Sequence, residues 1–150
     1  MRKMSVLLVL ALGVGCASGP KYAEIEGQIP PVPSDKGRIF VYRAGSMFGA
    51  AIQPAVFLND EKVGSSIPGG FFFLDRSPGN FEVKCATETD HRVTFTLAAR
   101  ETLYVQTTMA MGFFVGHAIP KLVDPQDGKA GVRKCSYTGT EWTPAGTGKK

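Results

Sequence analysis

Residue types that often carry out chemistry are scarce in this sequence of 150 residues. It contains two histidines, three cysteines and one tryptophan, and its formal net charge is only +4. Nucleophilic catalysis needs a base beside a serine or cysteine, and only His91 and His117 offer an imidazole. The sequence also lacks a G-x-S-x-G motif and a basic stripe with interleaved aromatic residues. This composition favours a protein that is not an enzyme and that binds no nucleic acid.

The sequence also has no apolar run of about 20 residues, the length that a transmembrane helix needs. A shorter apolar run over residues 6–14 follows Arg2 and Lys3 and is typical of an export signal. It ends at Gly15 and Cys16, and a small residue followed by cysteine resembles the lipobox of bacterial lipoproteins. The resemblance implies that a signal peptide over residues 1–15 is removed and that Cys16 carries acyl chains such as palmitate.

An acylated Cys16 would attach the protein to a lipid membrane, because two or more acyl chains give a durable anchor. The next residue is Ala17. In enterobacterial sorting, an aspartate at this place retains lipoproteins in the inner membrane. By that resemblance, Ala17 favours a position in the cell envelope at the outer membrane, facing the periplasm.

The other two cysteines form an even pair in an oxidising compartment. We predict a disulfide between Cys85 and Cys135, which would close a loop of about 50 residues and contribute roughly 4 kcal/mol. Two separate buried thiols are the alternative. A zinc site shared with His91 and His117 is less favoured, because no two of these four residues have the spacing of a zinc finger. We therefore expect no metal and no cofactor.

The two ends of the mature chain differ in composition from its middle. Residues 16–36 carry four prolines and few large apolar side chains, which is typical of a flexible tether. In the polyproline conformation this tether could hold a domain up to about 60 Å from the membrane. Residues 138–150 are polar and are predicted to be disordered, although Trp142 could pack back onto the domain. The folded domain is predicted over residues 37–137.

Short runs of β-branched and aromatic residues, separated by Gly, Pro, Asn and Asp, indicate strands and turns in this middle part. Apolar and polar residues alternate clearly in residues 81–86 and 92–97, which places Cys85 on an inner face. We predict an all-β fold, a small antiparallel β-sandwich of about seven or eight strands. The candidate strands span residues 38–43, 55–58, 71–74, 81–86, 92–97, 103–109, 112–119 and 131–136.

Two apolar stretches raise a question of burial. Residues 109–116 contain no polar side chain, and they fit either a strand buried on both faces or an exposed lip. In the second interpretation, Met111, Phe113 and Phe114 would bind a partner protein or lipid, because adaptable methionine and rigid phenylalanine suit binding surfaces. For residues 71–73, alternation predicts that the three phenylalanines are not all buried.

The order of several segments resembles a family of small bacterial lipoprotein domains of unknown function. The resemblance spans residues 37–136, implies no enzyme activity and supplies no catalytic residues. At two places where the family usually has glycine, this sequence has Asp60 and Arg100. The segments that carry the resemblance are residues 37–43, 56–64, 78–79, 101–105 and 122–125.

These features together favour a non-enzymatic envelope lipoprotein that binds another envelope component. One alternative is a small-ligand carrier or enzyme with a pocket near His117 and residues 109–116. A purely structural part of a larger envelope assembly is another. A deep pocket that holds His117 and a carboxylate would favour the enzyme or carrier.

Overall fold

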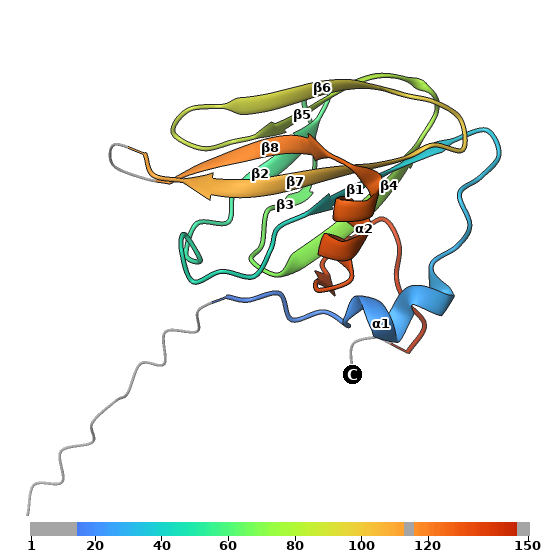
Figure 1. The fold of residues 1–150 in the computed structure, drawn as a ribbon, viewed down its shortest axis with the longest axis horizontal. Helices are drawn as coiled ribbons and strands as arrows, with labels where there is room; N and C mark the ends of the chain where they lie inside the picture. The colour runs from blue at the N-terminus through green and yellow to red at the C-terminus, as the bar shows by residue number, and fades with distance from the viewer. Residues whose placement is uncertain (1–14, 113–115, 147–150) are drawn as a thin grey trace, which may run out of the picture.

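The computed structural model describes residues 15–112 and 116–146, and it shows two β-sheets packed face to face (Figure 1). The predicted all-β sandwich is confirmed. One sheet has five strands in the order β8-β7-β1-β4-β9, and the other has four in the order β3-β2-β5-β6. The strands are β1 (Gly37–Tyr42), β2 (Ala55–Leu58), β3 (Glu61–Ser65), β4 (Gly70–Arg76), β5 (Gly79–Cys85), β6 (His91–Leu97), β7 (Thr102–Ala110), β8 (His117–Val123) and β9 (Ser136–Tyr137).

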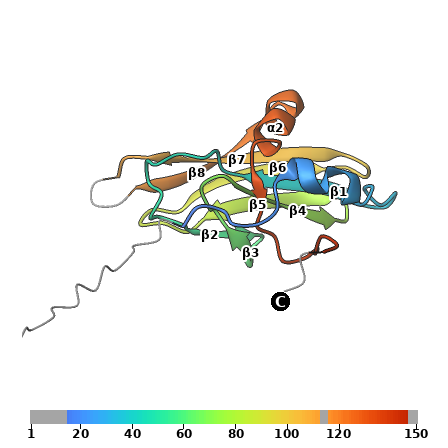
Figure 2. The ribbon, with the colours of Figure 1, turned by 90° about the horizontal axis from the view of Figure 1, so that it is seen from below.

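The five-stranded sheet is mixed rather than purely antiparallel. Strand β1 pairs in parallel with β7, and β4 pairs in parallel with β9. The other strand pairs are antiparallel, and the two sheets approach each other where β6 runs beside β8. Figure 2 shows the layers from the side of the helices and the chain ends.

The central strands of the five-stranded sheet are buried on both faces. All six residues of β1 and the first five of β4 are buried. One face packs against the other sheet: the Phe72 ring lies 2.9 Å from the position that a Cβ on Gly64 of β3 would occupy. The prediction that the three phenylalanines are not all buried is therefore wrong, since Phe71, Phe72 and Phe73 are 0%, 2% and 5% exposed.

The outer face of the five-stranded sheet carries a cluster of aromatic rings. Phe40 stacks on Tyr104 with ring centroids 5.2 Å apart, and Phe73 lies 5.5 Å from Trp142. Tyr137 makes edge contacts with both Phe71 and Trp142. Aromatic pairs of this kind bury large apolar areas. The N-terminal segment, the helix after β8 and the end of the chain cover this face and extend the hydrophobic core to this side of the sheet.

The N-terminal segment is part of that cover, so the prediction of a flexible tether over residues 16–36 is wrong. It contains α1 (Tyr22–Ile25) and the 3₁₀ turn η1 (Glu26–Gln28), and Ile25 is only 2% exposed. The backbone N–H of Tyr22 donates to the carbonyl of Cys135 at 3.0 Å. A few apolar side chains and backbone pairing thus hold a proline-rich segment on the domain.

The C-terminal segment also differs from the prediction. Residues 131–136, predicted as a strand, hold the end of α2 (Pro125–Val132) and the first residue of β9. Asp124 caps this helix by accepting a hydrogen bond from the backbone N–H of Gln126 at 2.9 Å. Residues 138–146 pack on the domain through Trp142, which corrects the predicted disordered tail. Residues 147–150 lie outside the described residues.

Strand direction divides the connecting loops between two ends of the sandwich. Residues 44–54, 66–69, 86–90 and 111–112 lie at the end from which β2, β4, β6 and β8 start, and we call it the Cys16 end. The turn at Asn59 and Asp60, the turn at Ser77 and the connection at Arg100 lie at the opposite end. None of the helices within the described residues is long and apolar enough to cross a bilayer.

Candidate functional site

Cys16 lies on the surface of the domain and is exposed. On one side of it, the carbonyl of Gly15 accepts a hydrogen bond from the Gln53 side chain at 2.5 Å. On the other, the backbone N–H of Ala17 donates to the carbonyl of Pro68 at 3.2 Å. The predicted cleavage before Cys16 would remove the Gly15 contact, but the Ala17 contact would remain and hold the predicted acylated cysteine against the domain.

The loop of residues 44–54 beside Cys16 is shaped by a buried arginine. Arg43 is 3% exposed, and its guanidinium donates to the carbonyls of Ile52 at 2.7 Å, Gly49 at 2.8 Å and Ser66 at 3.1 Å. Burial lowers the pKa of Arg43, but arginine has so high a pKa that the side chain stays charged. Because a buried charge is costly unless it is hydrogen-bonded, these carbonyls hold the loop in one arrangement.

Large apolar side chains protrude from the loops at the Cys16 end. Met47 is 78% exposed, Phe48 is 49% exposed, and Met111, which follows β7, is 81% exposed. We call these three residues the apolar rim. The loop of residues 44–54 meets the end of β7, since a Cβ on Gly49 would lie 3.1 Å from the Met109 side chain. Cys16 and Met47 line one surface hollow of ≈ 460 Å³.

The apolar rim bears on the two interpretations of residues 109–116. Strand β7 ends at Ala110 and Met111 is exposed, so a single strand buried on both faces is excluded for this part of the run. Phe113 and Phe114 lie outside the described residues, and their proposed role in binding stays a prediction. Met47 and Phe48 were not predicted from the sequence as binding residues. The signal was present, because two large apolar residues stand between the glycines of a loop, where no core position is expected.

His117, the first residue of β8, lies at the same end of the sandwich. Its ring meets that of His91 edge to face, with centroids 5.4 Å apart. Within the described residues, its buried Nδ1 atom has no hydrogen-bond partner, and neither histidine is hydrogen-bonded to a carboxylate. The described part of the chain also holds no group of three or more His, Cys, Asp or Glu residues that could bind a metal ion.

The structure corrects the predicted disulfide, because Cys85 and Cys135 are separate free thiols. Cys85 ends β5 in the four-stranded sheet, where it pairs with Val56 and His91. Cys135 lies just after α2, and its Sγ atom contacts the carbonyls of Gly131 at 3.3 Å and Arg43 at 3.5 Å. Burial raises the pKa of Cys85 to about 12 and that of Cys135 to about 11. Both groups therefore stay protonated and unreactive near neutral pH.

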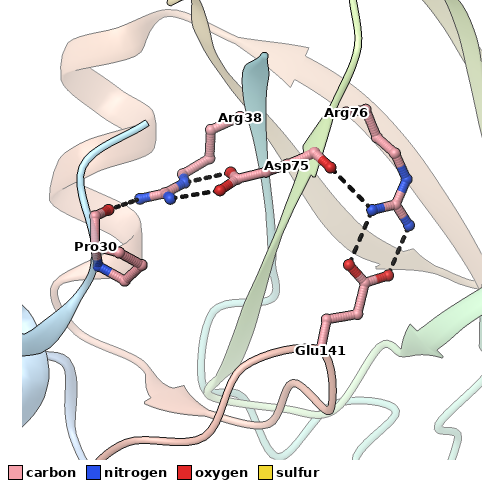
Figure 3. Close-up of polar contacts among 5 residues, drawn as sticks. All are labelled: Pro30, Arg38, Asp75, Arg76 and Glu141. Atoms are coloured by element: carbon pink, nitrogen blue, oxygen red, sulfur yellow. Dashed lines mark hydrogen bonds and ion pairs between the residues drawn. The ribbon is translucent and has the colours of Figure 1, made fainter. Parts of the chain in front are cut away.

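Two ion pairs fix the cover over the outer face of the five-stranded sheet (Figure 3). Arg38 binds the Asp75 carboxylate through Nε at 2.6 Å and Nη2 at 2.7 Å, and it also donates to the carbonyl of Pro30 at 2.8 Å. Arg76 binds both oxygens of Glu141 at 2.6 and 2.9 Å. The hydrogen bond from Arg38 to Pro30 attaches the N-terminal segment to the sheet, and the ion pair between Arg76 and Glu141 attaches the C-terminal segment.

Comparison with known proteins gives one match. No curated protein and no solved structure matches the chain. A family model described as "Protein of unknown function (DUF2846)" matches residues 33–118, which lie within the sandwich from just before β1 to the start of β8. The match covers more than half of the sequence, and the chain belongs to this family of proteins of unknown function.

Proposed function

We propose that this protein is a bacterial envelope lipoprotein, anchored in a lipid membrane through acylated Cys16. Its β-sandwich would act as a non-enzymatic module that binds or scaffolds another envelope component. Ala17 favours the outer membrane and the periplasmic side, by the sorting rule described above. The apolar run of residues 6–14 behind Arg2 and Lys3 supports export of the chain.

One observation carries the proposal: the cysteine that follows the export-type run is also the exposed one. Cys16 lies on the surface, whereas Cys85 and Cys135 are buried. Acylation requires that an enzyme reach the sulfur atom. The sequence pattern and the exposure of Cys16 therefore select the same residue.

Intact mass of the detergent-extracted protein tests the anchor. Wild-type protein should lack residues 1–15 and carry the added mass of acyl chains, and it should sediment with membranes. The Cys16→Ala variant should carry no acyl mass, and the Cys85→Ala variant should be acylated like wild type. An unmodified, soluble wild-type product would overturn the proposal.

Crosslinking in membranes, followed by purification in mild detergent, tests the binding role. We expect a partner protein that is captured with wild-type protein in a fixed ratio. Recovery of the acylated protein alone, at native expression level and with several crosslinker lengths, would contradict a scaffolding role while leaving the anchor intact.

A further inference from the structure

We propose that the Cys16 end of the sandwich rests directly on the lipid bilayer, with the side chains of Met47, Phe48 and Met111 in the boundary between headgroups and acyl chains. This inference rests on the proposed acylation of Cys16. It replaces a domain held away from the membrane on a tether with a domain that lies against it in a fixed orientation.

The first argument is the length of chain between the anchor and the domain. The backbone N–H of Ala17, the residue after the anchor, donates a hydrogen bond to the carbonyl of Pro68 on the domain surface. Farther along the same segment, the backbone N–H of Tyr137 donates to the carbonyl of Pro20 at 2.8 Å. Acyl chains on Cys16 would therefore enter the bilayer beside the domain, because no free linker separates the two.

The second argument is the location of the exposed apolar side chains. Among the described residues, large hydrophobic side chains that are exposed are Met47, Phe48, Met111 and Leu122. The loop of residues 44–54 and the end of β7 lie at the same end of the domain as the start of the coloured N-terminal ribbon in both views (Figures 1 and 2). An apolar patch of this kind beside a lipid anchor would lose its contact with water when the anchor enters the bilayer.

The third argument is that the arrangement limits the depth of insertion. The loop of residues 86–90, which joins β5 and β6 at the same end, carries Glu88 and Asp90 and would stay in water. The guanidinium of Arg43 is buried and hydrogen-bonded to carbonyls inside the domain, so the nearby arginine adds no exposed charge to the apolar rim. We therefore infer shallow contact, of about 5–10 Å as in interfacial helices, on the side of the 44–54 loop.

A fluorescent label sensitive to polarity tests this orientation. Met47→Cys provides a labelling site on the apolar rim, and Ser77→Cys provides a matched control in an exposed turn at the opposite end. Because Cys85 and Cys135 are buried and Cys16 is acylated, the introduced thiol is the one that reacts. Each acylated protein is placed in vesicles of phosphatidylethanolamine and phosphatidylglycerol that contain lipids with a nitroxide quencher at a shallow acyl position.

We expect the label at position 47 to shift its emission to the blue and to lose most of its intensity to the quencher, while the label at position 77 does neither. Equal behaviour at the two positions, in protein that floats with the vesicles, would overturn the inference and leave the anchor standing. Failure of the Ser77→Cys protein to float would instead contradict the proposed anchor. A label at position 47 that is shielded in native membranes but not in vesicles would show a protein partner and would also overturn the inference.

Discussion

Arg38 and Asp75, which lie directly opposite each other on β1 and β4, form a two-pronged ion pair beneath the N-terminal segment (Figure 3). The Arg38 guanidinium also lies 4.4 Å from the centre of the Phe73 ring. One side chain thus joins the sheet, the carbonyl of Pro30 and the aromatic cluster. These contacts explain why an arginine occupies the second position of an otherwise apolar strand.

Removing one partner of this pair should destabilise the domain much more than removing one partner of the neighbouring pair. The Arg38 and Asp75 side chains are 4% and 21% exposed, whereas Arg76 and Glu141 are 23% and 41% exposed. We expect Arg38→Met to lower the free energy of unfolding by about 3 kcal/mol, because it leaves a largely buried carboxylate unpaired. Arg76→Met should cost about 1 kcal/mol or less. Urea unfolding of both variants, each made in the Cys16→Ala protein, measures the two losses in free energy of unfolding. Equal losses would contradict the role of Arg38 in joining the sheet to the N-terminal segment.

Gly131→Ala should destabilise the protein, although alanine is the better helix former. A Cβ at Gly131 of α2 would collide with the ring of Tyr42, so the helix or the ring must move. We expect a loss of about 1–3 kcal/mol, the usual cost of overpacking. Gly27→Ala is the control, because nothing lies within 4 Å of its Cβ position and the change should be neutral or slightly stabilising. A higher melting temperature for Gly131→Ala would show that α2 does not lie against the sheet.

Arg100→Gly should stabilise the protein. Arg100 has φ +64°, a left-handed conformation that costs a residue with a side chain about 1–2 kcal/mol. Its backbone N–H, which donates to the carbonyl of Lys36, is kept by glycine. We expect a gain of about 1 kcal/mol. Ala99→Gly should instead lose about 0.5–1 kcal/mol, since its φ is ordinary and glycine adds freedom to the unfolded chain.

The two buried thiols should be unreactive in the folded protein. In the Cys16→Ala variant at pH 8, we expect neither Cys85 nor Cys135 to react with iodoacetamide, because burial keeps their pKa near 12 and 11. Unfolding in denaturant without a reductant should expose two reactive thiols. Mass spectrometry that finds no free thiol after unfolding would support a disulfide and contradict the structure.

Stability should also fall in alkaline solution. Burial raises the pKa of Cys85, Cys135, Tyr42 and Tyr104 in the folded protein. These groups therefore lose protons more easily in the unfolded chain, which favours unfolding once the pH exceeds their ordinary values of about 9 to 10. Below pH 9 both states are protonated and this effect is absent. Urea unfolding should show no loss of stability from these groups between pH 7 and pH 9 and a decline from pH 9 to pH 11, and a flat profile up to pH 11 would mean that the groups are not buried.

The strand pattern of the middle of the chain was readable from the sequence because alternation and turn residues act locally. Phe81, Val83 and Cys85 were predicted on one face, and the predicted bounds agree with β5 within two residues and with β6 within one residue at each end. The turn residues at Asp60 and Arg100 were also informative about the backbone. Asp60 has φ +66° and Arg100 has φ +64°, so both positions have the left-handed backbone conformation that glycine adopts most easily.

The segments that cover the outer face of the five-stranded sheet could not be predicted from local sequence patterns. Ile25 and Trp142 lie in segments whose prolines, glycines and polar residues are typical of disorder, and one or two apolar side chains give no periodic signal. They are ordered because β1 and β4 offer an apolar outer face that only exists once the sheet has formed. The same cover explains why residues 71–73 are all buried: one face of the strand packs on the other sheet, and the covering segments bury the opposite face.

The sequence by itself determined the fold class and the candidate anchor, since strand alternation and the run that ends at Cys16 are properties of neighbouring residues. Only the tertiary structure decided what lies beside that anchor. Met47 and Met111 are distant in sequence, and Cys85 and Cys135 form an apparently even pair. Their actual positions depend on which strand edges and loops meet in space, and this is set by packing across the whole domain rather than by any local pattern.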